Sequence, residues 1–160
     1  MSVAFTKEDS AETASELVLP DRPISTALNL VTQDGLDALR QQLVAARDAY
    51  EAAQMLTDLN ERRRQSAVPL RDLRYFSERV RTAQLVLESE TGTVVTFGCV
   101  VTFRRSDGRS QTFRLVGEDE ADPKAGTLSY VSPVGKELMG REAGETIRIA
   151  SQEATIVSIR

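Results

Sequence analysis

The chain has 160 residues, of which 41% are hydrophobic and 5% aromatic, so one ordinary domain or two small ones with aliphatic cores are expected. The formal net charge of -4 argues against a protein that holds duplex DNA by neutralising its phosphates. The absence of histidine excludes Ser-His-Asp and Cys-His catalysis and histidine-ligated zinc within this chain, and the single cysteine excludes an intrachain disulfide.

Residues 1–29 are polar and are interrupted by Pro20 and Pro23, without a sustained apolar stripe. We expect a flexible extension here, with a short partner-binding segment as the alternative. The first residues lack the basic and apolar regions of a signal peptide, and no run approaches the ~20 apolar residues of a membrane span. These patterns predict a cytoplasmic protein with no membrane contact.

Residues 30–89 carry two apolar stripes that advance by alternating steps of three and four residues, the spacing of a coiled-coil seam. We expect two helices folded as an antiparallel hairpin that turns near residues 61 and 62. The arm would be about 35 Å long, taking ~1.5 Å per residue over about 24 residues. The first stripe and the second consist of Leu36, Leu39, Leu43, Ala46, Tyr50 and Ala53, and of Leu73, Phe76, Val80, Ala83 and Leu87. The expected facing pairs are Leu36 with Leu87, Leu39 with Ala83, Leu43 with Val80, Ala46 with Phe76, and Tyr50 with Leu73.

The helix limits follow from residues that favour helix starts. Thr32 is the expected N-cap of the first helix. Pro69 is expected in the first turn of the second helix, which would continue over residues 70–87, with Ser66 as its candidate cap. The predicted turn then places five charged residues at the free end of the arm: Asp58, Glu61, Arg62, Arg63 and Arg64.

Beyond residue 92 the pattern changes from helical to alternating, which predicts strands at residues 94–104, 110–117, 127–131, 146–150 and 153–159. Asp107-Gly108 is a strong hairpin signal between the first two strands. Ser132 is the expected cap and Pro133 the first residue of a short helix over residues 134–139. The acidic loop at residues 118–122 is expected to be solvated.

Residues 132–146 read Ser-Pro-Val-Gly-Lys-Glu-Leu-Met-Gly-Arg-Glu-Ala-Gly-Glu-Thr and closely resemble the C-terminal signature of the bacterial GreA/GreB transcription elongation factors. That signature has a Ser-Pro-aliphatic start, a short helix, a Gly-Lys/Arg turn and Gly-Asp/Glu before a strand. Residues 117–122 and 129–133 are similar to the preceding strand and loop of the family. The hairpin opened by Leu30-Val31-Thr32 also fits, so the resemblance covers residues 30–160.

The resemblance implies an α+β fold, in which a flexible extension (residues 1–29) precedes an antiparallel coiled-coil hairpin (30–89) and a small FKBP-like domain (93–160). That last domain would have an antiparallel sheet and one short helix. The resemblance also implies that the partner is the RNA polymerase core. The globular domain would dock at the rim of the secondary channel through Ser132, Pro133 and Asp122, and the coiled coil would enter the channel. The chain would be a monomeric accessory factor and not itself an enzyme.

At the tip, the resemblance implies a role for Asp58 and Glu61, because cleavage factors of the family carry Asp-Leu-x-Glu there. Their two carboxylates help to hold Mg²⁺ at the polymerase active centre. In this chain Arg62, Arg63 and Arg64 replace the residues that usually follow, and the arm is about one heptad short, ~10 Å in reach. The arginines would form a solvated, self-paired face or contact RNA or nucleotide phosphate.

Several functions stay open on these patterns. The chain could stimulate transcript cleavage by RNA polymerase, or it could be a non-cleaving competitor similar to the regulator of nucleoside diphosphate kinase. From other classes, it could be an FKBP-like prolyl isomerase, for which the few aromatic residues of the globular part are unfavourable, or a structural coiled-coil adaptor or dimeriser.

Overall fold

The computed structural model describes residues 19–87 and 92–160. They divide into two compact units, one with residues 19–26 and 39–81 and the other with residues 27–38, 82–87 and 92–160. Residues 1–18 of the predicted extension lie outside the described part. The predicted division at residues 29, 89 and 93 stays a prediction. Among the described residues, no helix is apolar enough over the length that a membrane crossing requires.

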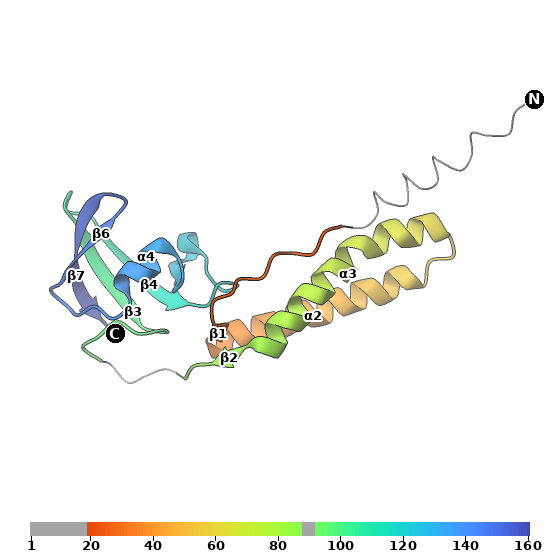
Figure 1. The fold of residues 1–160 in the computed structure, drawn as a ribbon, viewed down its shortest axis with the longest axis horizontal. Helices are drawn as coiled ribbons and strands as arrows, with labels where there is room; N and C mark the ends of the chain where they lie inside the picture. Colours follow the sequence, from red (N-terminus) through yellow and green to blue (C-terminus); the bar gives the residue numbers. More distant parts are fainter. Residues whose placement is uncertain (1–18, 88–91) are drawn as a thin grey trace, which may run out of the picture. The chain divides into compact units, whose positions relative to one another are not determined.

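The helical hairpin is confirmed, with α2 at Gln33–Gln54 and α3 at Leu59–Thr82 (Figure 1). Thr32 is the N-cap of α2, as expected, because its Oγ1 accepts a hydrogen bond from the Gly35 amide at 3.0 Å. The 24 residues of α3 correspond to about 36 Å at ~1.5 Å per residue, which agrees with the predicted arm length.

The predicted start of the second helix is wrong. Helix α3 begins at Leu59, so Pro69 lies inside it and Ser66 is not its cap. The cap is Asp58, whose Oδ1 accepts a hydrogen bond from the Glu61 amide at 2.7 Å. Pro69 was expected in a first turn because it cannot donate to the carbonyl four residues earlier. The longer helix tolerates that loss at Gln65.

The earlier start of α3 also moves the turn from residues 61 and 62 to residues 55–58. The centre of the turn thus lies about five residues earlier than predicted. In an antiparallel hairpin the numbers of two facing residues add up to twice the turn centre, so each α2 residue faces a residue about ten positions earlier in α3 than predicted. A groove lined by Ala49, Ala53, Gln65 and Pro69 among others agrees with this register. The predicted pairs are accordingly wrong; Leu87, for example, lies beyond the end of α3 and is 76% exposed. The first stripe itself is confirmed, because Leu39, Ala46 and Ala53 are buried at intervals of seven residues.

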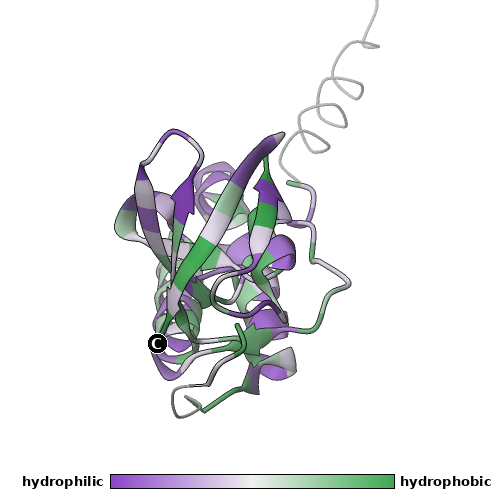
Figure 2. Ribbon diagram, turned by 90° about the vertical axis from the view of Figure 1, so that its left-hand side faces the viewer, coloured by the Kyte–Doolittle hydropathy of each residue, from purple (hydrophilic) through white to green (hydrophobic). Residues whose placement is uncertain are grey.

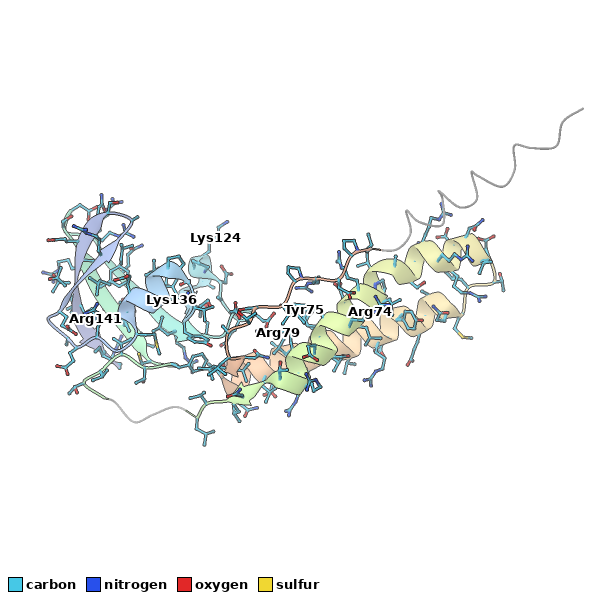
Figure 3. All side chains as sticks on the ribbon, viewed as in Figure 1. Arg74, Tyr75, Arg79, Lys124, Lys136 and Arg141 are labelled. Carbon is cyan, nitrogen blue, oxygen red and sulfur yellow. The ribbon has the colours of Figure 1, made fainter. Side chains whose placement is uncertain are left out.

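An extended segment at residues 19–26 packs on α3. The guanidinium carbon of Arg22 lies 3.7 Å from the ring centroid of Tyr75, and its Nη1 lies 3.5 Å from Asp72 Oδ1. Next to it, Arg74 Nη1 donates a hydrogen bond to Asp21 Oδ1 at 3.1 Å. Arg74 and Tyr75 are labelled on this face of α3 in Figure 3. The segment is thus held by one cation–π contact and two ion pairs.

Replacing Arg22 with alanine should lower the free energy of unfolding of the arm by about 1 kcal/mol, because the cation–π contact and one ion pair are lost together. Urea denaturation followed by helical circular dichroism measures this. Arg47→Ala is the matched control, since Arg47 is an exposed arginine of α2 in the same unit. Equal effects of the two substitutions would contradict the anchoring role of Arg22.

The unit with residues 27–38, 82–87 and 92–160 is called the C-terminal unit. It contains a curled five-stranded sheet with strand order β5-β4-β3-β7-β6 and one short α-helix, α4 (Figure 1). The bounds are β3 Val100–Arg105, β4 Ser110–Val116, β5 Thr127–Ser129, α4 Pro133–Leu138, β6 Thr146–Ile149 and β7 Gln152–Ile159. A 3₁₀ turn, η1, lies at Pro123–Ala125. The α+β fold class is confirmed. The sheet is antiparallel except that β5 runs parallel to β4, which the sequence analysis did not foresee. The long loop that contains η1 carries the chain back before β5 begins, so both strands point the same way.

The core of this unit follows from the alternation along the strands. Val101 and Phe103 of β3 point to the same side and are buried, and the residues between them are more exposed. Figure 2 shows this alternation as hydrophobic and hydrophilic bands on the strands. The other buried members of the core are Val95, Leu115, Leu128, Leu138, Ile147, Ile149, Ala154 and Ile156.

Two details differ from the predicted elements, and one predicted turn is confirmed. The strand expected from residue 94 begins only at Val100, because a turn with Gly98 at φ +89° precedes it. The Asp107-Gly108 hairpin is confirmed, with Gly108 at φ +84° and the Arg105 amide donating to the Arg109 carbonyl at 2.8 Å. A short parallel pair, β1 at Leu30–Val31 and β2 at Gln84–Leu85, was not predicted.

Candidate functional site

The first candidate site is the tip of the hairpin, where five charged residues were predicted to gather. Arg62 turns back on the preceding turn, because its Nε and Nη2 donate hydrogen bonds to the Leu56 carbonyl at 2.8 and 2.6 Å. These charge-assisted bonds are made to a carbonyl of the turn between α2 and α3. Arg62 therefore fixes the turn itself.

The two carboxylates of the tip are both engaged. Asp58 caps α3 through its Oδ1, as described above. Glu61 accepts a hydrogen bond from Gln65 Nε2 at 2.8 Å through Oε1, and Oε2 accepts from Arg64 Nη2. The hydrogen bonds from Gln65 and Arg64 lower the pKa of the Glu61 carboxyl below its ordinary value. Glu61 is thus an ionised partner of groups on its own helix.

Asp58 and Glu61 were also expected to help hold Mg²⁺ together with ligands of the polymerase. Mg²⁺ prefers near-octahedral oxygen ligands, of which a site needs several. The described residues contain no group of three or more acidic, histidine or cysteine side chains placed to hold a metal ion. In the free chain one oxygen of Asp58 caps α3 and both oxygens of Glu61 accept hydrogen bonds. A role of the pair at a metal that the polymerase also holds stays a prediction.

The structure separates the three arginines that the sequence presents as a run. Arg62 is bound to the turn and Arg64 to Glu61. Arg63 is exposed, and its guanidinium makes no ion pair within the described ranges. Of the three, Arg63 is therefore the one whose guanidinium is exposed and has no ion pair with a described residue.

The second candidate site surrounds β5, where the three docking residues were predicted. Ser132 Oγ accepts a hydrogen bond from the Gly135 amide at 3.0 Å and donates one to the Ser129 carbonyl at 2.7 Å. The predicted cap of α4 is confirmed, and Pro133 follows as its exposed first residue. At the other end of β5, Asp122 Oδ1 accepts from the Lys124 amide at 3.0 Å and caps η1.

Gly135 is a residue of this site that the sequence analysis did not single out. A Cβ built on Gly135 would collide with the Ser129 carbonyl oxygen and lie 2.9 Å from the Tyr130 backbone. Helix α4 therefore packs at Gly135 directly against the backbone of Ser129 and Tyr130, and only glycine fits at this position. The signal in the sequence was the glycine in the first turn of a short helix, where glycine is unfavourable.

Glu120 is a second residue whose role was missed, since its acidic loop was expected to be solvated. Its Oε2 accepts a hydrogen bond from the Thr32 hydroxyl at 2.6 Å, within the C-terminal unit. Thr32 caps α2, and a negative charge at a helix N-terminus is stabilised by the helix dipole. A Cβ on Gly35 would collide with the same carboxylate, so Gly35 makes room for it.

The sequence of this chain is similar to known proteins over its C-terminal part and beyond it. The family model described as transcription elongation factor GreA/GreB, C-terminal part, matches residues 89–160. A transcription elongation factor GreA of Desulfovibrio desulfuricans is 32% identical over 136 residues, which are 79% of this chain and 83% of that protein. A second GreA, of Novosphingobium aromaticivorans, is 34% identical over 121 residues, or 71% of this chain and 77% of that protein.

Among solved structures, the GreA factor homolog 1 of Thermus thermophilus is similar over 84% of this chain and 99% of that chain, at 20% identity and a TM-score of 0.40. The sequence relatives extend over both helices and the sheet, beyond the matched C-terminal part. The chain therefore belongs to the GreA/GreB family of transcription elongation factors.

Proposed function

We propose that this chain is an accessory factor that binds core RNA polymerase and regulates elongation. The observation that carries this proposal is the 32% identity to a transcription elongation factor GreA over 79% of the chain. In this proposal the C-terminal unit docks at the rim of the secondary channel and the hairpin enters the channel. The polymerase catalyses the reactions, and this chain contributes the charged side chains at the tip of the hairpin.

The docking part of the proposal rests on Pro133 and Asp122. Both are exposed and flank β5 in the chain, Asp122 as the cap of η1 and Pro133 as the first residue of α4. Their loops are held by side-chain caps, since Ser132 caps α4 and Asp122 caps η1. Rigid loops of this kind present a surface at low conformational-entropy cost.

At the tip, the geometry favours a non-cleaving competitor for the channel. Both Glu61 oxygens accept hydrogen bonds from Arg64 and Gln65, so Glu61 is not an open ligand. The arm also falls ~10 Å short of the reach implied by the resemblance, and side chains do not bridge such a gap. In the channel, Arg63 would be the tip residue that faces RNA or nucleotide phosphate, because its charge is open to solvent.

Stimulation of cleavage is the second candidate, and one observation favours it. Asp58 and Glu61 lie three residues apart at the start of α3, the spacing of the cleavage factors. The prolyl isomerase alternative has no such support, because Phe97 and Phe103 are buried and Phe113 packs against the core. These rings are not available to line a substrate pocket.

Copurification of core RNA polymerase with the tagged chain tests the proposal, with a prolyl isomerase assay beside it. We expect polymerase binding without isomerase activity. Pro133→Ala and Asp122→Asn should each weaken binding about threefold to tenfold, because they alter the docking surface and keep both caps. Asparagine retains the side-chain oxygen that caps η1, so Asp122→Asn removes only the charge.

Ser110→Ala is the matched control for these substitutions, since Ser110 is exposed at the start of β4 in the same unit. It should leave the affinity unchanged. If Pro133→Ala and Asp122→Asn bind polymerase as tightly as the control does, the docking surface has been placed wrongly.

A further inference from the structure

We propose that Arg64 is a built-in counter-cation of Glu61, so that the tip of the arm carries a guanidinium where a divalent metal would otherwise be held. The part of this inference that concerns the channel rests on the proposed function. The part that concerns metal binding is a property of the free chain.

The arrangement gives each oxygen of Glu61 its own donor. Arg64 Nη2 donates to Oε2, and Gln65 Nε2 donates to Oε1 at 2.8 Å. These donors lie three and four residues after Glu61, which places all three side chains on one face of α3. Asp58 caps α3 and fixes its start at Leu59, so Glu61 lies in the first helical turn and Arg64 and Gln65 follow one turn later.

The charge of the tip points the same way. Asp58 and Glu61 contribute -2 and the three arginines +3, so the tip has a net charge of +1. Arg62 keeps its charge beside the turn, since its guanidinium is bound to the Leu56 carbonyl. A divalent cation that binds Glu61 must therefore displace the Arg64 guanidinium and do so against a positive net charge of the tip.

The ion pair alone would be a weak barrier. The side chains of Arg64 and Glu61 are 63% and 38% exposed, and such exposed pairs change an equilibrium only about twofold to fivefold. Removal of Arg64 does two things at once, because it frees Oε2 and lowers the tip charge from +1 to zero. Removal of Arg63 changes the charge equally and leaves the Glu61 pair intact.

This difference gives a matched experiment on the full chain in the absence of polymerase. Mn²⁺ is the probe, and the paramagnetic broadening of the amide signals of residues 58–65 is measured by NMR during a titration. We expect Arg64→Ala to reach a given broadening at about threefold or more lower Mn²⁺ than the wild type. Arg63→Ala should shift the titration clearly less, since both oxygens of Glu61 stay occupied.

Two results would overturn the proposal. One is broadening at the tip of the wild type at the same Mn²⁺ concentration as in Arg64→Ala. The other is an equal shift in Arg63→Ala and Arg64→Ala, which would assign the effect to charge alone. Helical circular dichroism checks that α3 is intact, and Arg64→Gln provides a second variant that keeps a long side chain. The double variant Glu61→Ala with Arg64→Ala should lose the gained binding.

A separate assay distinguishes failure of this inference from failure of the proposed function. Binding of each variant to core RNA polymerase is measured on its own. If the chain does not bind polymerase, the proposed function fails while the Mn²⁺ titration still decides the role of Arg64. If it binds, Arg64→Ala should retain the affinity, because Arg64 is paired with Glu61 and lies apart from the proposed docking residues Pro133 and Asp122. A loss of affinity would contradict the part that concerns the channel.

Discussion

Gly135→Ala should destabilise the C-terminal unit by about 3 kcal/mol or more, the upper range of overpacking substitutions. The reason is that the new Cβ would collide with the Ser129 carbonyl and lie 2.9 Å from the Tyr130 backbone. Backbone atoms cannot move aside as a flexible side chain does, so α4 must shift. The gain of about 1 kcal/mol in helix propensity on replacing glycine offsets only part of this cost.

Gly92→Ala is the control for that substitution, because the Cβ there would have its nearest neighbour at 3.7 Å, an ordinary contact. Its effect should stay within about 0.5 kcal/mol. Thermal or urea unfolding of the full chain, followed by NMR signals of the sheet, measures both variants. Binding to RNA polymerase should fall with Gly135→Ala, since the Ser132-Pro133 loop moves with α4. Equal stability of the two variants would contradict the close approach of α4 to β5.

Leu39→Asp is expected to unfold the arm, at a cost of about 3–5 kcal/mol, because it buries a charge without a partner. Leu39 is the best-buried member of the first stripe, with 3% exposure. The buried cluster around the sheet lies in residues 95–156, outside α2 and α3, and should stay folded. Loss of helical circular dichroism with retained NMR signals from the sheet is the expected result.

Val44→Asp makes the same chemical change on the same helix at a position that is 52% exposed, and it should have little effect. Limited proteolysis then tests the division of the chain. The Leu39→Asp arm should be digested first, leaving a resistant fragment that begins near Thr93. If the arm and the sheet are digested at the same rate, the two parts do not fold independently and the predicted division is wrong.

The elements that were predicted correctly depend on neighbours in the sequence. The Asp107-Gly108 turn, the Ser132 cap and the alternation of β3, β6 and β7 are all signals within a few residues. Such signals depend on the local backbone and not on distant contacts, so they can be recognised in the sequence alone.

The start of α3 was missed because two local signals compete. Pro69 favours a helix start, and the polar run of arginines before it lacks an apolar stripe. Asp58 is an equally good cap, and it prevails because the Arg62 contact with Leu56 closes the turn beside it. The choice between the two starts depends on how α2 ends.

Long-range polar contacts could not be predicted at all. Glu120 meets Thr32 across 88 positions, and Arg22 meets Tyr75 across more than fifty. Nothing in an acidic loop or a proline-containing extension identifies the partner of a single side chain. At the tip, the pairing of Glu61 with Gln65 and Arg64 could be recognised only once the start of α3 was known.

Displacement of a labelled Gre-family cleavage factor from core RNA polymerase tests the central claim most directly, because it reports binding and the shared channel together. The full chain should displace the labelled factor in a saturable manner, and backtracked complexes should then shed the 3′ end of their RNA no faster than without it. Arg63→Ala should weaken the displacement. If a saturating concentration of the protein does not displace the labelled factor, the proposal that this protein occupies the secondary channel is contradicted. Cleavage that accelerates and depends on Asp58 and Glu61 would contradict its non-cleaving role.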